Sequence, residues 1–129
     1  MQELRRYRRR TNTPITAVQF NIDIDGFNYK KWGGEQRCKR GDWLVDNDGD
    51  IYTIDDEVFN RTYRKITPGR YVKSSPVWAR IALESGTIKT KEGSSDYRPG
   101  DYLVYNSPDG IDGYCMSAKK FDSIYEADE

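Results

Sequence analysis

The sequence predicts an α+β fold that is mainly antiparallel β, built from two repeated modules packed with pseudo-twofold symmetry. Three observations predict it. A Gly-Asp-aromatic-Leu-Val motif occurs twice, at residues 41–47 and 100–106. A turn and a second β-prone run follow each copy. A short amphipathic segment with a helix-capping residue then ends each module. We expect a single compact domain over residues 1–129, with one repeat in residues 1–66 and the other in 67–129.

The spacing between the two copies favours a tandem duplication. Gly41 and Gly100 are 59 residues apart, and further downstream the offset becomes 62. The later matches are Tyr52 with Tyr114, Phe59 with Phe121, and Tyr63 with Tyr125. Insertions and deletions that compensate each other in loops are expected when a structural unit has been duplicated.

Each module is expected to open with a strand. Residues 18–24 alternate apolar and polar side chains, which predicts a half-buried strand with Val18, Phe20, Ile22 and Ile24 facing inward. Residues 77–83 take that part in the second module, followed by a turn at 84–86 and a strand over 87–91. We expect a loop at 92–99. Thr67-Pro68-Gly69-Arg70 has the composition of a connection between the modules.

A hairpin and a short helix are expected next in each module. Asn47-Asp48-Gly49-Asp50 is a strong hairpin-turn signal, and residues 107–110 form a longer one. Asp55 and Ser117 are good N-caps for the helices that follow. The apolar face consists of Val58, Phe59, Thr62 and Tyr63 in the first helix and of Phe121, Ile124 and Tyr125 in the second.

Composition removes several kinds of chemistry. The chain has no histidine, which excludes Ser-His-Asp triads and histidine-containing zinc sites. It has no glycine-rich phosphate loop and no nucleophile elbow. Residues 21–26 match half of a calcium-binding loop, but Trp32 stands where the bidentate glutamate is needed. We therefore expect no metal, no cofactor and no enzymatic activity, with a small carboxylate-based enzyme as an alternative.

The chain has two cysteines and no CxxC motif, and it contains no apolar signal stretch or membrane-spanning run. These features are typical of a cytoplasmic protein. An excess of Tyr, Trp and Arg is typical of binding surfaces. The Gly-Asp-aromatic turns have two interpretations. As structure, the aspartates accept backbone N–H groups and the aromatics begin core strands. As function, the two turns line a groove shared by the repeats. On that interpretation the binding residues are Trp32, Arg40, Asp42, Trp43, Asp101 and Tyr102.

An arginine-rich start offers an alternative function. Its members are Arg5, Arg6, Arg8, Arg9 and Arg10, which could neutralise nucleic-acid phosphates. A sequence pI near 6.3 and the absence of a continuing basic stripe weigh against it. In the other interpretation this stretch is a solvated leader into the first strand.

Tyr7-Arg8-Arg9-Arg10 followed by residues 15–20 resembles the opening of small, largely uncharacterised phage and prophage proteins, which begin with a Tyr-Arg-Lys-Lys-Pro stretch and a strand. Residues 98–102 and 121–126 resemble their Pro-Gly-Asp-aromatic hairpin and Phe-x-x-x-Tyr-Glu helix. The first copy departs from this pattern, with Arg40 at the proline position and Arg64 after Tyr63.

The resemblance implies a phage or mobile-element origin and, for such a protein, the cytoplasm of the host cell. We expect a non-enzymatic interaction protein that binds a host or phage protein, or a small molecule, between the repeats. Nucleic acid is the alternative partner. No membrane association is expected, and the protein is expected to be a monomer or a homodimer.

Overall fold

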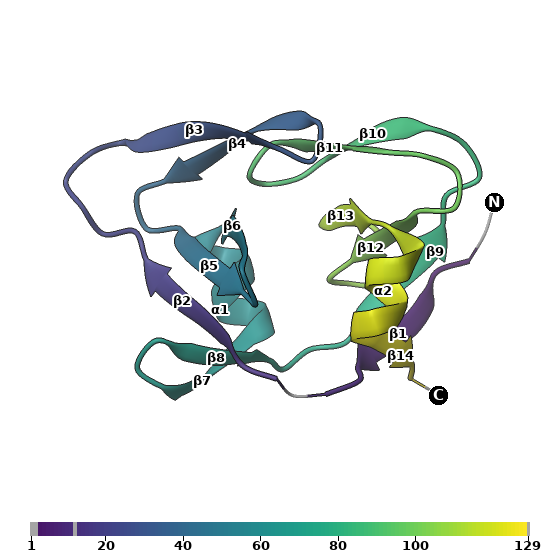
Figure 1. The fold of residues 1–129 in the computed structure, drawn as a ribbon, viewed down its shortest axis with the longest axis horizontal. Coiled ribbons are helices and arrows are strands. Elements are labelled where there is room, and N and C mark those ends of the chain that lie inside the picture. Colours follow the sequence, from purple (N-terminus) through teal and green to yellow (C-terminus); the bar gives the residue numbers. More distant parts are fainter. Residues whose placement is uncertain (1–2, 12, 129) are drawn as a thin grey trace.

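The computed structural model describes residues 3–11 and 13–128. Strands contain 53% of the residues and two helices 11%, and every strand pairing among the described residues is antiparallel. The prediction of a mainly antiparallel β fold is confirmed. Two five-stranded sheets lie side by side, each with one helix, and two hairpins meet along one edge (Figure 1).

The first sheet has the strand order β6-β5-β2-β8-β7. Its strands are β2 (Ile15–Gln19), β5 (Trp43–Asn47), β6 (Asp50–Ile54), β7 (Tyr63–Thr67) and β8 (Arg70–Lys73). Helix α1 (Asp56–Thr62) joins β6 to β7. A separate hairpin of β3 (Gly26–Lys31) and β4 (Gly34–Lys39) is inserted between β2 and β5.

The second sheet has the strand order β13-β12-β9-β1-β14. Its strands are β9 (Val77–Ile81), β12 (Tyr102–Tyr105), β13 (Gly113–Met116), β14 (Tyr125–Ala127) and β1 (Arg5–Arg9). Helix α2 (Ala118–Ile124) joins β13 to β14. The hairpin of β10 (Gly86–Lys89) and β11 (Ser94–Tyr97) is inserted between β9 and β12. Strand β1 pairs with β9 on one side and with β14 on the other.

The two inserted hairpins touch each other. Gln36 in β4 forms a bridge with Gly93, next to β11, and the Asp96 N–H donates to the Trp32 carbonyl at 3.0 Å. A Cβ atom at Gly93 would collide with the Glu35 carbonyl oxygen, so only glycine permits this close approach. The hairpins therefore connect the two halves of the molecule on one side.

Each sheet has a core built around one helical phenylalanine. Phe59 of α1 stacks on Trp43, with centroids 4.1 Å apart and planes 13° apart, and on Tyr63 at 4.9 Å and 8°. Tyr71 meets Phe59 edge-on at 5.0 Å. Ile15, Ala17 and Val45 complete this buried cluster. The large aromatic area compensates for a chain that is only 36% hydrophobic.

The second core has a comparable arrangement. Phe121 of α2 stacks on Tyr102, with centroids 3.9 Å apart and planes 10° apart. Tyr7 of β1 meets Phe121 edge-on at 4.9 Å, and Tyr125 lies 5.0 Å away. Val77, Ala79 and Val104 are buried beneath these rings.

Several local predictions are confirmed. Asn47 and Asp50 face each other across β5 and β6, and the two residues between them have positive φ angles, 54° at Asp48 and 91° at Gly49. This is the backbone of a type I′ turn. Asp55 accepts the Val58 N–H at the start of α1, and Ser117 accepts the Lys120 N–H at the start of α2.

The inward face of the first strand differs from the prediction. Strand β2 ends at Gln19, and its buried side chains are Ile15 and Ala17. Val18 is 60% exposed, and Ile22 and Ile24 lie beyond the strand, where they are exposed too. Because side chains alternate along a strand, placing Ile15 and Ala17 against Phe59 turns Val18 outward. The predicted alternation over 18–24 was therefore wrong in both register and extent.

Two other assignments are corrected. Residues 92–99, expected to be a loop, contain β11, which pairs with β10 through backbone hydrogen bonds and buries little apolar surface. Its polar sequence, Ser-Ser-Asp-Tyr, carries no alternation signal. Residues 67–70 do not link the halves, because they form the turn between β7 and β8 within the first sheet. The expected solvated leader forms strand β1, whose backbone completes the second sheet.

Candidate functional site

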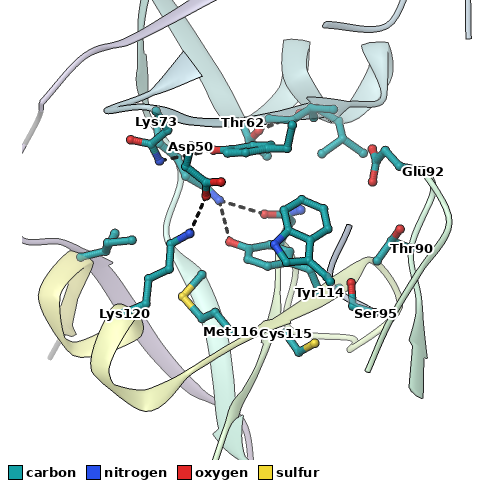
Figure 2. Close-up of a pocket in the computed structure, with 18 of the residues that line it drawn as sticks. Asp50, Thr62, Lys73, Thr90, Glu92, Ser95, Tyr114, Cys115, Met116 and Lys120 are labelled. Carbon is teal, nitrogen blue, oxygen red and sulfur yellow. Dashed lines mark hydrogen bonds and ion pairs between the residues drawn. The ribbon is translucent and has the colours of Figure 1, made fainter. Parts of the chain in front are cut away.

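A cavity of about 360 Å³ lies between the two halves (Figure 2). Its lining comes from β6, α1, β7 and β8 on one side and from β13, α2 and β14 on the other. The tip of the β3–β4 hairpin and residues 90–95 contribute a further wall. This volume falls within the roughly 300–1,000 Å³ of small-molecule sites.

Lys73, at the end of β8, reaches from the first sheet to side chains of the second. Its Nζ lies 3.2 Å from the Tyr114 hydroxyl, 3.5 Å from the Tyr125 hydroxyl and 3.3 Å from Asn106 Oδ1. The ammonium also lies 5.9 Å from the ring centroid of Tyr63. Hydroxyls, an amide oxygen and aromatic faces solvate this cation, but each of them is neutral.

The tyrosine hydroxyls around Lys73 have different acidities. Burial, together with the neighbouring Tyr125, raises the pKa of Tyr114 well above its usual value. Burial alone would also raise the pKa of Tyr125. The Lys73 charge and a hydrogen bond from Tyr114, with Arg9 contributing, outweigh burial and lower it. Burial likewise raises the pKa of Tyr63 well above its usual value. The centre of the cavity is thus cationic and rich in hydroxyl donors.

The carboxylates at the cavity edge are already engaged. Asp50 accepts from Lys120 at 2.6 Å, which ties β6 to α2 (Figure 2). It also accepts from Lys31 at 2.8 Å, which ties β6 to the β3–β4 hairpin. Burial of Asp50 favours its neutral form, but these two lysines outweigh burial and lower its pKa. Asp112 pairs with Arg61 at 2.7 Å.

Glu92 is the third carboxylate of the lining. It accepts the Asp55 N–H at 2.5 Å. Burial raises its pKa above the usual value. Among the described residues no cation pairs with Glu92, so nothing offsets the effect of burial.

Trp32 contributes an aromatic face to the cavity from a strained backbone. It occupies the first turn position between β3 and β4 with φ 58°, followed by Gly33 at 78°. Asn, Asp or Gly normally takes this position, because the left-handed region is unfavourable for larger side chains. The Trp32 ring lies 5.7 Å from that of Tyr52 and remains 39% exposed.

The sequence-predicted binding residues are mostly not brought together. Trp32 lines the cavity, whereas Arg40, Asp42, Trp43, Asp101 and Tyr102 do not. Arg40 pairs with the exposed Asp23 at 2.8 Å. Trp43 and Tyr102 are packed in the two cores, and Trp43 Nε1 donates to Asp56 Oδ1 at 2.9 Å.

The two aspartates have local structural contacts. Asp42 Oδ2 accepts the Lys39 N–H at 2.9 Å, and Asp101 Oδ2 accepts the Arg98 N–H at 3.0 Å. The expected backbone hydrogen bonds of the Gly-Asp turns are confirmed.

The arginine-rich segment is largely occupied by neighbours. Arg6 pairs with Asp128 at 3.0 Å and Arg8 with Glu126 at 3.4 Å, both across strands β1 and β14. Arg10 Nε donates to the Asp122 carbonyl at 2.6 Å, and the Arg5 guanidinium lies 5.9 Å from the Tyr7 ring centroid. Arg9 differs, because it lines the cavity.

Lys73, Asn106, Tyr114 and Tyr125 were not predicted as site residues. The offset of 62 did single out both tyrosines, but as marks of duplication. Lys73 belongs to no motif, and its role depends on β8 lying beside the second sheet's residues. Only the two tyrosines carried a sequence signal of the site, because a buried tyrosine hydroxyl requires a hydrogen-bond partner.

The thiols and carboxylates form no recognisable reactive centre. Burial raises the pKa of both Cys38 and Cys115 to about 11, which keeps these free thiols protonated near neutral pH. Within residues 3–11 and 13–128, no group of three or more acidic or cysteine side chains is arranged to hold a metal ion. No helix in that part of the chain is long and apolar enough to cross a membrane.

No family model, curated protein or solved structure matches this chain. The resemblance to phage and prophage proteins therefore stays a prediction.

Proposed function

We propose that this protein is a non-enzymatic binding protein that holds a small molecule in the cavity between its two sheets. The observation that carries the proposal is the cavity itself, about 360 Å³ in volume and lined from both halves. Apolar side chains such as Ile54, Val58 and Met116 lie there beside a few converging polar groups. That mixture is the usual composition of a ligand site.

The absence of an activated group supports binding rather than catalysis. The cavity thiol, Cys115, has a raised pKa. Asp50 and Asp112 are paired with cations, and Glu92 accepts a backbone N–H. Among these groups, the two lysines lower the pKa of Asp50, which makes it a weak general base near neutral pH.

We further propose that the two halves are duplicated modules related by a pseudo-twofold axis that passes near the cavity. Matching hydrogen bonds support this. The Phe20 N–H donates to the Asp42 carbonyl at 2.7 Å, and the Ala82 N–H donates to the Asp101 carbonyl at 2.8 Å. The strand orders also support the proposal. The order β6-β5-β2-β8-β7 matches β13-β12-β9-β1-β14 when β1 of the second sheet is taken as the equivalent of β8 in the first.

A screen of neutral, cationic and anionic fragments by amide chemical shifts tests the binding proposal. We expect fragments to shift the amides of β6 and β13 in the wild-type protein. Met116→Trp, which fills the cavity, should abolish these shifts, whereas Ile111→Trp, at a position 80% exposed, should preserve them. Circular dichroism verifies that both variants fold. Fragments that bind Met116→Trp as well as wild type, or an empty screen, would overturn the proposal.

A further inference from the structure

Two of the cations that line the cavity are Lys73 and Arg9. Lys73 of β8 is the cross-strand neighbour of Tyr63, and Arg9 of β1 is the cross-strand neighbour of Tyr125. The Lys73 ammonium lies 5.9 Å from the Tyr63 centroid and 6.0 Å from the Tyr125 centroid. Arg9 is also close enough for its charge to act on both hydroxyls. The two positive groups therefore lie around the same pair of rings.

Neither cation has a carboxylate partner among the residues that the structure describes. Of the three lining carboxylates, Asp50 is bound by two lysines and Asp112 by Arg61, and Glu92 accepts the Asp55 N–H. By contrast, Arg6 and Arg8 on the same strand as Arg9 do pair with acidic side chains. Two half-buried like charges repel each other and lose hydration, which neutral hydroxyls and ring faces offset only in part. An anion in the cavity would remove that cost.

Trp32 is a second, independent observation. A tryptophan with φ 58° strains the backbone of the turn, whereas asparagine or glycine adopts this conformation readily. Its ring is left partly exposed beside Tyr52, in the wall of the same cavity. A flat partner in the cavity would cover the exposed part of the ring.

We propose that the cavity binds a small aromatic oxyanion, with Lys73 and Arg9 holding its charged group and Trp32 with Tyr52 contacting its ring. The inference rests on the proposed function and names its ligand class. The Tyr114 and Tyr125 hydroxyls lie 3.2 Å apart and share one hydrogen bond, so one O–H of the pair is left to donate to the oxyanion. The charged group is a carboxylate or a phosphate, which these donors recognise in the same way.

Isothermal titration calorimetry with four probes tests this: benzoate, phenyl phosphate, benzyl alcohol and inorganic phosphate. We expect benzoate or phenyl phosphate to bind at least tenfold more tightly than benzyl alcohol and inorganic phosphate. The tighter of the two identifies the oxyanion. Affinity should also fall as sodium chloride is raised, because the charge pairing is screened.

Matched variants locate the charge. Lys73→Met should weaken binding of the better probe at least tenfold, while Lys65→Met, an exposed lysine on β7, should leave it unchanged. Lys73→Arg keeps the charge and should retain binding, which guards against a folding defect in Lys73→Met.

The failures are distinguishable. Equal affinity for benzyl alcohol and benzoate, or binding unaffected by Lys73→Met, would overturn the anion assignment while leaving a cavity that binds fragments. If none of the four probes binds, the anion assignment fails as well. The proposed function fails only if the full fragment screen is empty too.

Discussion

The Gly-Asp turns offer a sharp comparison, because the same residue type has unequal surroundings in the two halves. Asp42 is buried, with 2% exposure, and accepts from Lys39 N at 2.9 Å, Lys39 Nζ at 3.0 Å and Asp56 N at 3.1 Å. Asp101 is only partly buried and accepts from Arg98 N at 3.0 Å. We expect Asp42→Ala to be far more destabilising than Asp101→Ala.

The magnitude follows from the donors left behind. Asp42→Ala strands two backbone N–H groups, one of them at the first turn of α1, and a lysine. At about 1–3 kcal/mol for each buried donor left unsatisfied, with water compensating some of it, the loss is about 3 kcal/mol. Asp101→Ala strands one N–H that water reaches, which costs about 1 kcal/mol. The free energy of unfolding should therefore differ by about 2 kcal/mol between the variants.

Urea unfolding, followed by circular dichroism and extrapolated to zero denaturant, measures both losses. The slope of the transition should stay constant, so that the midpoint reports stability. Equal losses in the two variants, or a loss below 1 kcal/mol for Asp42→Ala, would refute the assignment of Asp42 as a structural acceptor.

Three further outcomes are expected. Trp32→Asn should leave the free energy of unfolding unchanged or raise it, because asparagine relieves the strain of the turn, and it should weaken oxyanion binding. A clear loss of stability in urea would mean that Trp32 serves packing instead. Stability should fall as pH rises above 9.0, because Cys38 and Cys115, and above 10.0 also Tyr63 and Tyr114, have raised pKa values and keep protons in the native state that the unfolded chain releases. Tyr125, with a lowered pKa, acts in the opposite sense. Urea midpoints from pH 8 to pH 11 measure this, and Tyr114→Phe should reduce the fall. Deleting residues 1–10 should remove β1 and disrupt the second sheet, seen as lost amide dispersion for β9 and β14, whereas intact dispersion would contradict the pairing of β1.

Local features of the fold could be predicted from the sequence, and distant ones could not. The Asp48-Gly49 turn and the caps Asp55 and Ser117 depend on a few adjacent residues, so their chemistry is readable directly. The inward face of β2 was missed because Val18 and Ile22 are as apolar as Ile15, and only packing against Phe59 separates them.

The candidate site was largely beyond prediction. Trp32 was predicted as a binding residue, but the residues that line the cavity with it come from strands far apart in the chain. Lys73 and Tyr114 are 41 residues apart in sequence and meet only because β8 and β13 face one cavity. The arginine run was read as a solvated leader because charge density in a sequence does not reveal partners such as Glu126.

The position of β1 has a consequence for how the chain acquires its structure. Residues 5–9 are made before every other strand, yet their neighbours β9 and β14 lie more than 65 residues later. During synthesis the backbone groups of β1 therefore stay bound to water at least until β9 has been made, whereas the first sheet needs no strand beyond β8. The second sheet is completed only when β14 reaches the other edge of β1, so this half of the fold depends on contacts between residues far apart in the chain.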